Sequence, residues 1–120
     1  MQQNRPKLTL KHDASDRRPA SEAVEVLKHA LRHHLCVRAT YNRDIFILAP
    51  HILYERHGEP HLDAVAIERG GSKPQEAKLG TFKISGLRNV AMTSEPVAPF
   101  PDFDPADARY DEQVIASIGT

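Results

Sequence analysis

The sequence contains only one cysteine, Cys36, and this scarcity excludes one class of protein at once. A single thiol cannot form an intramolecular disulfide, so a secreted scaffold held together by disulfides is excluded. Cys36 lies within an apolar run, where a free cysteine behaves as a small hydrophobic residue. We therefore expect Cys36 to be buried in the core, with no positive field to lower its pKa.

Long apolar runs are missing as well. No stretch is long enough to span a bilayer. Residues 1–18 are polar and lack the apolar segment of a secretory signal. The absence of both features predicts a cytoplasmic protein without a membrane partner.

Neither sign of charge is in excess, because 16 lysines and arginines balance 16 aspartates and glutamates. This balance argues against a protein coated in positive charge for bulk nucleic-acid binding. It still leaves room for a local basic patch, since net charge does not describe how charges are distributed.

The 120 residues, 40% of them hydrophobic, are enough for one soluble domain with tails. Residues 1–18 are predicted to be disordered, because they bury too little apolar surface to offset the entropy lost on ordering. Leu8 and Leu10 could nevertheless form a short edge strand. Residues 19–94 are predicted to form a helix followed by a small barrel, and residues 95–120 an extended strap.

One helix is predicted from about Glu22 to His34. Ser21 is a suitable N-cap, and Glu22 and Glu25 place negative charge in the first turn, where it suits the helix dipole. Apolar and boundary side chains recur at helical spacing on one face: Ala23, Val24, Leu27, Leu31, His34 and Leu35. This face is expected to dock against the rest of the domain.

After His34 the apolar pattern changes from helical to alternating, which indicates β-strands. Five strands are predicted, at 37–41, 45–56, 61–68, 80–85 and 89–93. Pro50 lacks a backbone donor and should mark a bulge or an edge in the second of them. Five short strands joined by tight turns favour a small antiparallel barrel, whose closure would remove exposed strand edges.

The C-terminal part is rich in proline. Four prolines and two phenylalanines lie between Glu95 and Pro105, which predicts an extended strap that Phe100 and Phe103 pin to the barrel. The segment Asp107 to Ile118 is predicted to end in a short helix. That helix would carry Tyr110, Val114, Ile115 and Ile118.

Three stretches occur in the order typical of one known family: LKHALRHHLCVRATY, ending at Tyr41, then APHILYERHGEPHLDAVAIE, then GTFKISGLRNVAMT. In this order and spacing the chain resembles the WYL-domain family from about Val24 to Thr93. The signature Trp-Tyr-Leu triplet is replaced by Pro60-His61-Leu62. Gly86 stands where the family often has an arginine, and Arg88 lies two residues further on.

The resemblance implies a five-stranded barrel of the SH3 or Sm type behind a short helix. It also implies a stand-alone form of a bacterial regulatory module, because no winged-helix DNA-binding domain precedes the helix. Such a module would sense nucleic acid or a nucleotide-like ligand and pass the signal to a partner in transcription control, DNA damage response or phage defence. Pairing of two barrels into a homodimer is expected on the same ground.

The candidate ligand-binding residues combine cations with aromatic rings. Arginine and lysine can hold phosphate oxygens, while tyrosine and histidine can stack on bases. The alternative is that they are ordinary solvated strand and turn residues. The candidates are Tyr41, Arg43, His51, Tyr54, His61, Lys83 and Arg88.

Metal and enzyme chemistry find less support in the sequence. His29 and His33 are spaced for one helix face, but two ligands do not make a zinc site, and solvated histidines are the simpler interpretation. Ser72 and Ser85 lack the strand–turn–helix context of a catalytic nucleophile. We therefore predict no metal, no cofactor and no enzymatic activity.

Three hypotheses follow from the sequence. The first is a WYL-like regulatory module that binds an anionic ligand, such as single-stranded nucleic acid or a nucleotide, and modulates a partner regulator. The second is a protein-interaction or dimerisation module without a small ligand. The third, a metal-binding protein built on the histidines, is the weakest.

Overall fold

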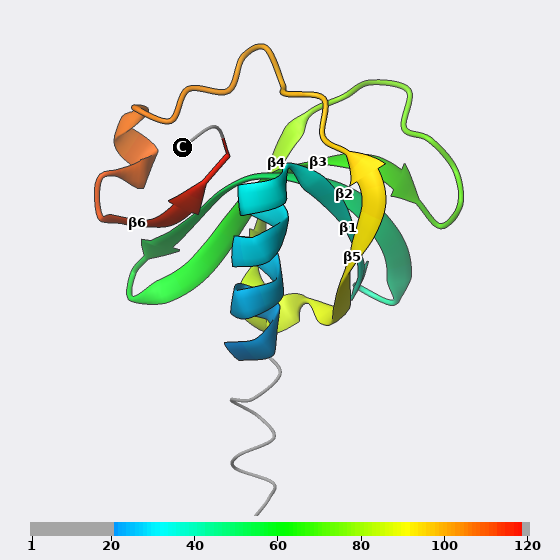
Figure 1. Ribbon diagram of the computed structural model, residues 1–120, viewed down its shortest axis with the longest axis horizontal. Coiled ribbons are helices and arrows are strands. Elements are labelled where there is room, and N and C mark those ends of the chain that lie inside the picture. Colours follow the sequence, from blue (N-terminus) through cyan, green and yellow to red (C-terminus); the bar gives the residue numbers. More distant parts are fainter. Residues whose placement is uncertain (1–20, 119–120) are drawn as a thin grey trace, which may run out of the picture.

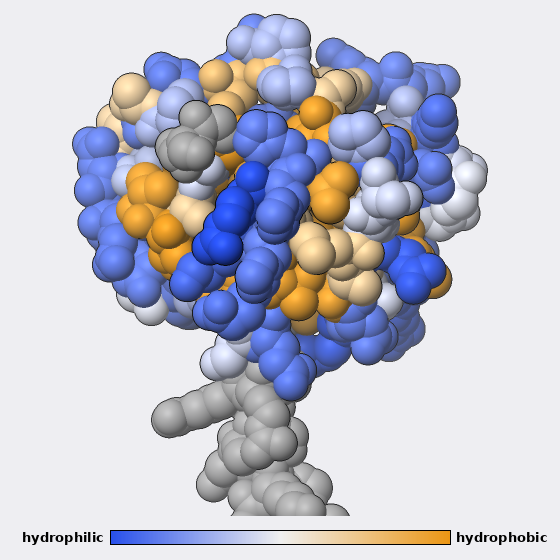
Figure 2. All heavy atoms as spheres, in the orientation of Figure 1, coloured by the Kyte–Doolittle hydropathy of each residue, from blue (hydrophilic) through white to orange (hydrophobic). Residues whose placement is uncertain are grey.

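The computed structural model describes residues 21–118, which form one helix and an antiparallel β-sheet (Figure 1). Residues 21–33 are helical. The predicted apolar face is buried, with Leu27 and Leu31 among the most buried side chains of the chain. The opposite face forms a hydrophilic strip on the surface, with apolar side chains on both sides of it (Figure 2).

The ends of the helix differ from the prediction. Ser21 is already helical rather than a cap. His34 does not belong to the helix, because its φ of 57° places it in the left-handed region. A residue in that conformation ends a helix, and here it turns the chain directly into the first strand.

Within residues 21–118, six strands form one sheet. They are β1 (Leu35–Tyr41), β2 (Asp44–Arg56), β3 (Glu59–Arg69), β4 (Leu79–Lys83), β5 (Arg88–Pro96) and β6 (Gln113–Ser117). The order is β4-β3-β2-β1-β5, every pairing is antiparallel, and β6 joins the sheet through β2. The predicted mainly β fold with one helix and an antiparallel sheet is therefore confirmed.

The sixth strand is a correction to the predicted C-terminal helix. A short 3₁₀ helix, η2 (Ala108–Tyr110), does occur, but Gln113–Ser117 is extended. The reason lies in the length of β2, whose first half pairs with β1 while Ile52–Glu55 has an open edge. The tail satisfies that edge as β6, because an unpaired row of backbone groups favours strand addition.

The sheet does not close into the predicted barrel. Among the described residues, β4 and β5 are the two ends of the strand order and do not pair with each other; a 3₁₀ turn, η1 (Ile84–Gly86), connects them. The helix lies against the inner face, where Leu27, Ala30 and Leu31 share one core with β1, β2, β3 and η1 (Figure 1). Because the helix already buries that face, the sheet needs no closure to shield it.

A bulge confirms the interpretation of Pro50. The register of β2 against β3 shifts between Pro50 and Ile52. Beside it, a second apolar cluster forms on the outer face from Cys36, Ala49, Val65 and Val97, with Phe100 packed against it. Cys36 is buried, as predicted, and Phe100 ties the strap to the sheet.

Two predictions concern residues outside the range 21–118 that the structure describes. Disorder in residues 1–18 and an edge strand at Leu8 and Leu10 lie outside the described residues. Of the helices within 21–118, none combines the length and the hydrophobicity needed to cross a membrane.

Candidate anion-binding face

The predicted binding residues do not form one cluster. His51 and Tyr54 are fully buried, with no exposed surface. His61 and Lys83 are direct cross-strand partners near the β2–β3 hairpin. The remaining residues, Tyr41, Arg43 and Arg88, come from β1, the β1–β2 turn and β5.

His51 holds the strap rather than facing solvent. Its Nδ1 lies 2.9 Å from the Ala49 carbonyl oxygen, and its Nε2 accepts a 2.9 Å hydrogen bond from the Phe100 backbone N–H. Phe103 packs edge-on against the ring. Burial lowers the pKa of His51, so the neutral ring that this bonding pattern requires is favoured.

Tyr54 belongs to a buried polar network around Asp63, which the sequence analysis missed. The Tyr54 hydroxyl and the Thr81 hydroxyl each donate a 2.8 Å hydrogen bond to Asp63 Oδ1. The Tyr110 hydroxyl donates a 2.6 Å bond to Asp63 Oδ2, and Arg109 Nη1 lies 3.6 Å from the same oxygen. The only sequence signal was an aspartate between the apolar Leu62 and Ala64, at mid-strand.

The aromatic residues of the candidate set have internal partners too. Tyr41 packs edge-to-face against Phe46 and Phe82, with ring centroids 6.0 and 5.2 Å apart. The His61 ring stacks on Tyr54 at 6.0 Å. These contacts occupy part of each ring, and both side chains are only partly exposed.

Lys83 is charge-compensated. Its Nζ lies 3.7 Å from a carboxylate oxygen of Glu59, with both side chains about half exposed. An exposed pair of this kind is weak, but it offsets the positive charge that an anionic ligand would need. The hairpin end of the sheet is therefore the poorer candidate for an anion site.

Arg43 shares a hollow with Arg38, which sequence reasoning missed. Arg88 pairs with the neighbouring Thr40 but lines a separate hollow beside the helix, together with Glu22 and Ala23. Arg38 pairs with Ile47 and Ala91, and Thr40 pairs with Ile45 and Arg88. Directly paired residues project from the same side of a sheet. Val37 and Ala39 point into the core, so Arg38 and its cross-strand neighbours point outward.

The β1–β2 turn places the third arginine at the edge of this surface. Asn42 and Arg43 have φ values of 50° and 68°, as a two-residue hairpin turn of the right twist requires. Arg43 is exposed and lines the same hollow as Arg38. The side chains Arg38, Arg43, Ile45 and Ile47, together with Arg88 on the neighbouring strand β5, are called the arginine face below.

The arginine face has a shallow hollow of about 530 Å³. Its lining includes Arg38, Arg43, Asp44, Ile45, Ile47 and Glu68. Ile45 is 55% exposed, which is unusual for a large apolar side chain. The carboxylate of Asp44 is already held by Arg69 Nε at 2.9 Å, which leaves Glu68 as the one unengaged acid of this lining.

The three arginines of this face are unpaired. Within residues 21–118, no carboxylate lies within ion-pair distance of Arg38, Arg43 or Arg88. Arg88 makes one long contact, 3.4 Å, to the Ser85 carbonyl oxygen. Unpaired guanidinium groups can bind a phosphate or carboxylate through two parallel hydrogen bonds.

The histidines of the helix do not form a metal site within the described residues. His29 and His33 are exposed and stack on each other, with ring centroids 6.5 Å apart. In the described part of the chain, no three histidine, cysteine or acidic side chains are grouped so that they could hold a metal ion.

Comparisons with protein-family models, with curated proteins and with solved structures gave no match for this chain. The WYL resemblance therefore rests on the sequence motifs alone.

Proposed function

We propose that this chain is a WYL-like regulatory module that binds an anionic ligand, a short single-stranded nucleic acid or a nucleotide, on the arginine face and thereby modulates a partner regulator. The observation that carries the proposal is that Arg38 and Arg43 line one hollow without ion-pair partners in the described chain, and that Arg88, also without one, lies on the neighbouring strand β5. In this proposal the protein binds its ligand without chemical conversion.

The proposed fold assignment covers only part of the sheet and leaves out β6. We take β1 to β5 and the preceding helix as an opened version of the SH3 or Sm type of barrel that the resemblance implies. The support is the consecutive antiparallel pairing of β1, β2, β3 and β4 and the return of β5 to β1. A cytoplasmic location is part of the same proposal.

The arginine face suits a ligand with both phosphates and a planar group. Guanidinium groups hold phosphate oxygens, and the exposed Ile45 offers apolar surface against which a base or sugar can pack. Because the net charge is zero, attraction of the ligand is local and falls off within about 10 Å at ordinary salt. Binding should therefore depend on these three arginines rather than on overall charge.

Fluorescence anisotropy with a labelled single-stranded oligonucleotide tests the proposal. If three phosphates are neutralised, the logarithm of affinity should fall with the logarithm of salt with a slope of about −2, a roughly 20-fold loss for fourfold more salt. Replacing Arg38, Arg43 or Arg88 by alanine should each reduce that slope by about 0.7.

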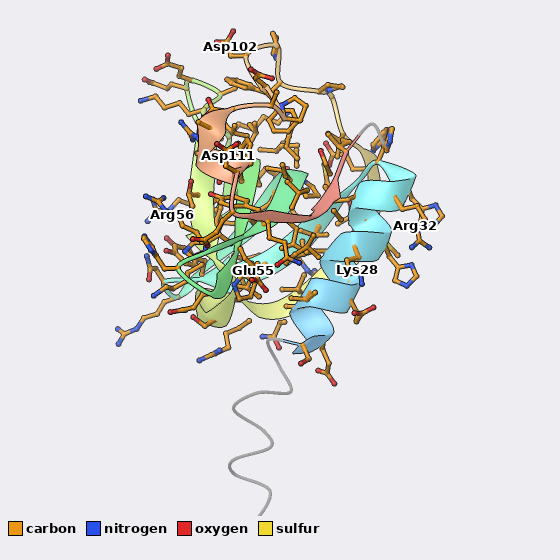
Figure 3. The ribbon with its side chains drawn as sticks, turned by 90° about the vertical axis from the view of Figure 1, so that its left-hand side faces the viewer. Lys28, Arg32, Glu55, Arg56, Asp102 and Asp111 are labelled. Carbon is orange, nitrogen blue, oxygen red and sulfur yellow. The ribbon has the colours of Figure 1, made fainter. Side chains whose placement is uncertain are left out.

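Arg56→Ala is the matched control. Arg56 is exposed, has no ion pair within the described residues, and lies at the opposite end of β2 from the arginine face (Figure 3). Its removal should leave the slope unchanged. Failure of the native chain to bind, or an equal effect of Arg56→Ala, contradicts the proposal.

A second candidate function, self-association, is favoured by a different observation. β5 is an edge strand in the described sheet, and Met92 on it is 45% exposed. Exposed edges and apolar side chains are sites where chains pair. Sedimentation at low and high salt separates the two functions, because apolar and backbone pairing tolerates salt while phosphate binding does not.

A further inference from the structure

Two adjoining hollows lie beside the strap, and neither shares a lining residue with the hollow of Arg38 and Arg43. The first, of about 370 Å³, lies between the strap and the 70–78 loop. Its walls are mostly apolar and include Val65, Ile67, Pro74, Pro99 and Phe100. An apolar hollow rimmed by polar residues is a typical docking site for an apolar side chain.

The second hollow, of about 470 Å³, shares Ala77 and Phe100 with the first. Four acidic residues and two basic ones line it, a formal charge of −4 + 2 = −2; they are Glu76, Asp102, Asp104 and Asp107, with Lys78 and Arg109. Both cations are engaged, Lys78 with Glu76 and Arg109 with Asp63 and Asp107. Within residues 21–118, Asp102 and Asp104 have no cationic partner.

The pair of hollows therefore fits an extended segment that carries apolar side chains next to cations. This chain contains such a segment, Arg5–Lys11, in which Leu8 and Leu10 alternate with Lys7, Thr9 and Lys11. In an extended chain the two leucines point the same way, toward one apolar surface. The long lysine stems can curve back to adjoining carboxylates.

Charge complementarity supports this segment as the occupant. Residues 1–18 contain five lysines and arginines and two aspartates, a formal charge of +5 − 2 = +3. The acidic hollow carries the opposite sign. Because the segment belongs to the same chain, it is present at an effective concentration of about millimolar, so weak contacts suffice to hold it.

The connecting chain is long enough. Lys11 is ten residues before Ser21, and ten residues can span up to about 35 Å. The 13 helical residues at 21–33 are about 20 Å long, and the helix runs from its first described turn toward the strap (Figure 1). The connecting chain can therefore pass the length of the helix with about 15 Å left over, and docking requires it to turn round the edge of the sheet within that length.

We propose that the segment Arg5–Lys11 docks into these two hollows of its own chain, with Leu8 and Leu10 in the apolar hollow and a flanking lysine against Asp102 and Asp104. This goes beyond the proposed ligand binding and uses different residues. The consequence is a self-contact that a competing basic and apolar peptide could displace.

The first test compares backbone amide NMR spectra of the full chain with those of a Leu8→Ser, Leu10→Ser variant. Amide shifts should change at residues 65–67, 74–77 and 98–102, while a Thr9→Ser control should leave them in place. The differences should also persist on dilution. Changes confined to residues 5–11 overturn the proposal, and loss on dilution overturns docking within one chain.

The second test titrates a labelled peptide of residues 4–12 into the Leu8→Ser, Leu10→Ser chain, whose own segment can no longer compete. Asp102→Lys should lower the affinity for the peptide by about three- to tenfold at low salt, the range expected for reversing one exposed charge. Asp111→Lys is the control, since Asp111 lies in the same strap outside the hollow (Figure 3). No binding, or equal weakening by both variants, overturns the proposal, whereas oligonucleotide binding by the arginine face would be unaffected.

Discussion

The hydroxyl of Tyr110 donates a 2.6 Å hydrogen bond to Asp63 across 47 residues of sequence, which ties the C-terminal strap to the centre of β3. Asp63 has no exposed surface. A buried carboxylate is tolerated only where donors replace its lost hydration. Tyr54, Thr81 and Tyr110 supply those donors. Because Tyr110 belongs to the strap, the strap is part of the folded core.

Tyr110→Phe should destabilise the protein by about 1–3 kcal/mol, because it leaves one oxygen of a buried carboxylate short of a donor. Urea unfolding followed by circular dichroism measures the change. Tyr41→Phe is the matched control, since the Tyr41 hydroxyl makes no hydrogen bond within residues 21–118 and its loss should change stability by less than about 0.5 kcal/mol. Equal losses of unfolding free energy in the two variants would contradict a stabilising hydrogen bond from Tyr110.

His51 should make stability fall in mild acid. Burial lowers its pKa in the folded protein below the ordinary value of 6.5, so the unfolded chain takes up a proton first. The stabilisation is complete above pH 6.5 and is lost progressively as the pH falls from there through the folded pKa. Over that window the slope contributed by His51 stays below about 1.4 kcal/mol per pH unit, the limit for one proton.

Unfolding free energies at pH 7.5 and 5.5, for the native chain and His51→Gln, measure this contribution. The variant should lose stability at both pH values and show a flatter pH dependence. His29→Gln, at an exposed helix position, should keep the native slope. An unchanged slope in His51→Gln would refute the prediction.

Cys36 should be inert toward thiol reagents in the folded protein. Burial, the larger effect, and the nearby Glu95 raise its pKa to about 11, so almost no thiolate exists at pH 8. Reaction with a chromogenic disulfide should proceed only as fast as the chain unfolds, and urea should release it. Immediate labelling of Cys36 in native buffer would contradict its burial in the apolar cluster with Ala49, Val65 and Val97.

Gly86→Ala should destabilise the protein by about 1 kcal/mol, because the Tyr41 ring must shift by a few tenths of an ångström to admit the methyl group. A methyl group at position 86 would lie 3.0 Å from the ring of Tyr41, closer than normal contact. Gly80→Ala is the control, because its nearest neighbour would lie at an ordinary 3.7 Å. Thermal unfolding of both variants checks this, and equal melting temperatures would contradict it.

The helix, the strands β1 to β5 and the buried Cys36 could be predicted from local pattern. Helical spacing places Leu27 and Leu31 on one face, and alternation places Val37 and Ala39 on another. Pro50 marks a bulge because it has no N–H to donate wherever the chain goes. These features depend on periodicity and on the chemistry of single residues, which the order of amino acids contains.

Only the tertiary structure decided the rest. The β-branched Val114 and Ile115 favour a strand over a helix, but only the open edge of β2 supplies the partner that a strand needs. His51 and Tyr54 have the polarity of ligand-binding residues, yet the strap buries them. Arg38 joins Arg88 only because β5 returns to β1 across 50 residues of sequence. Contacts between segments distant in the chain determine all three outcomes, and no local pattern records which distant segments will meet.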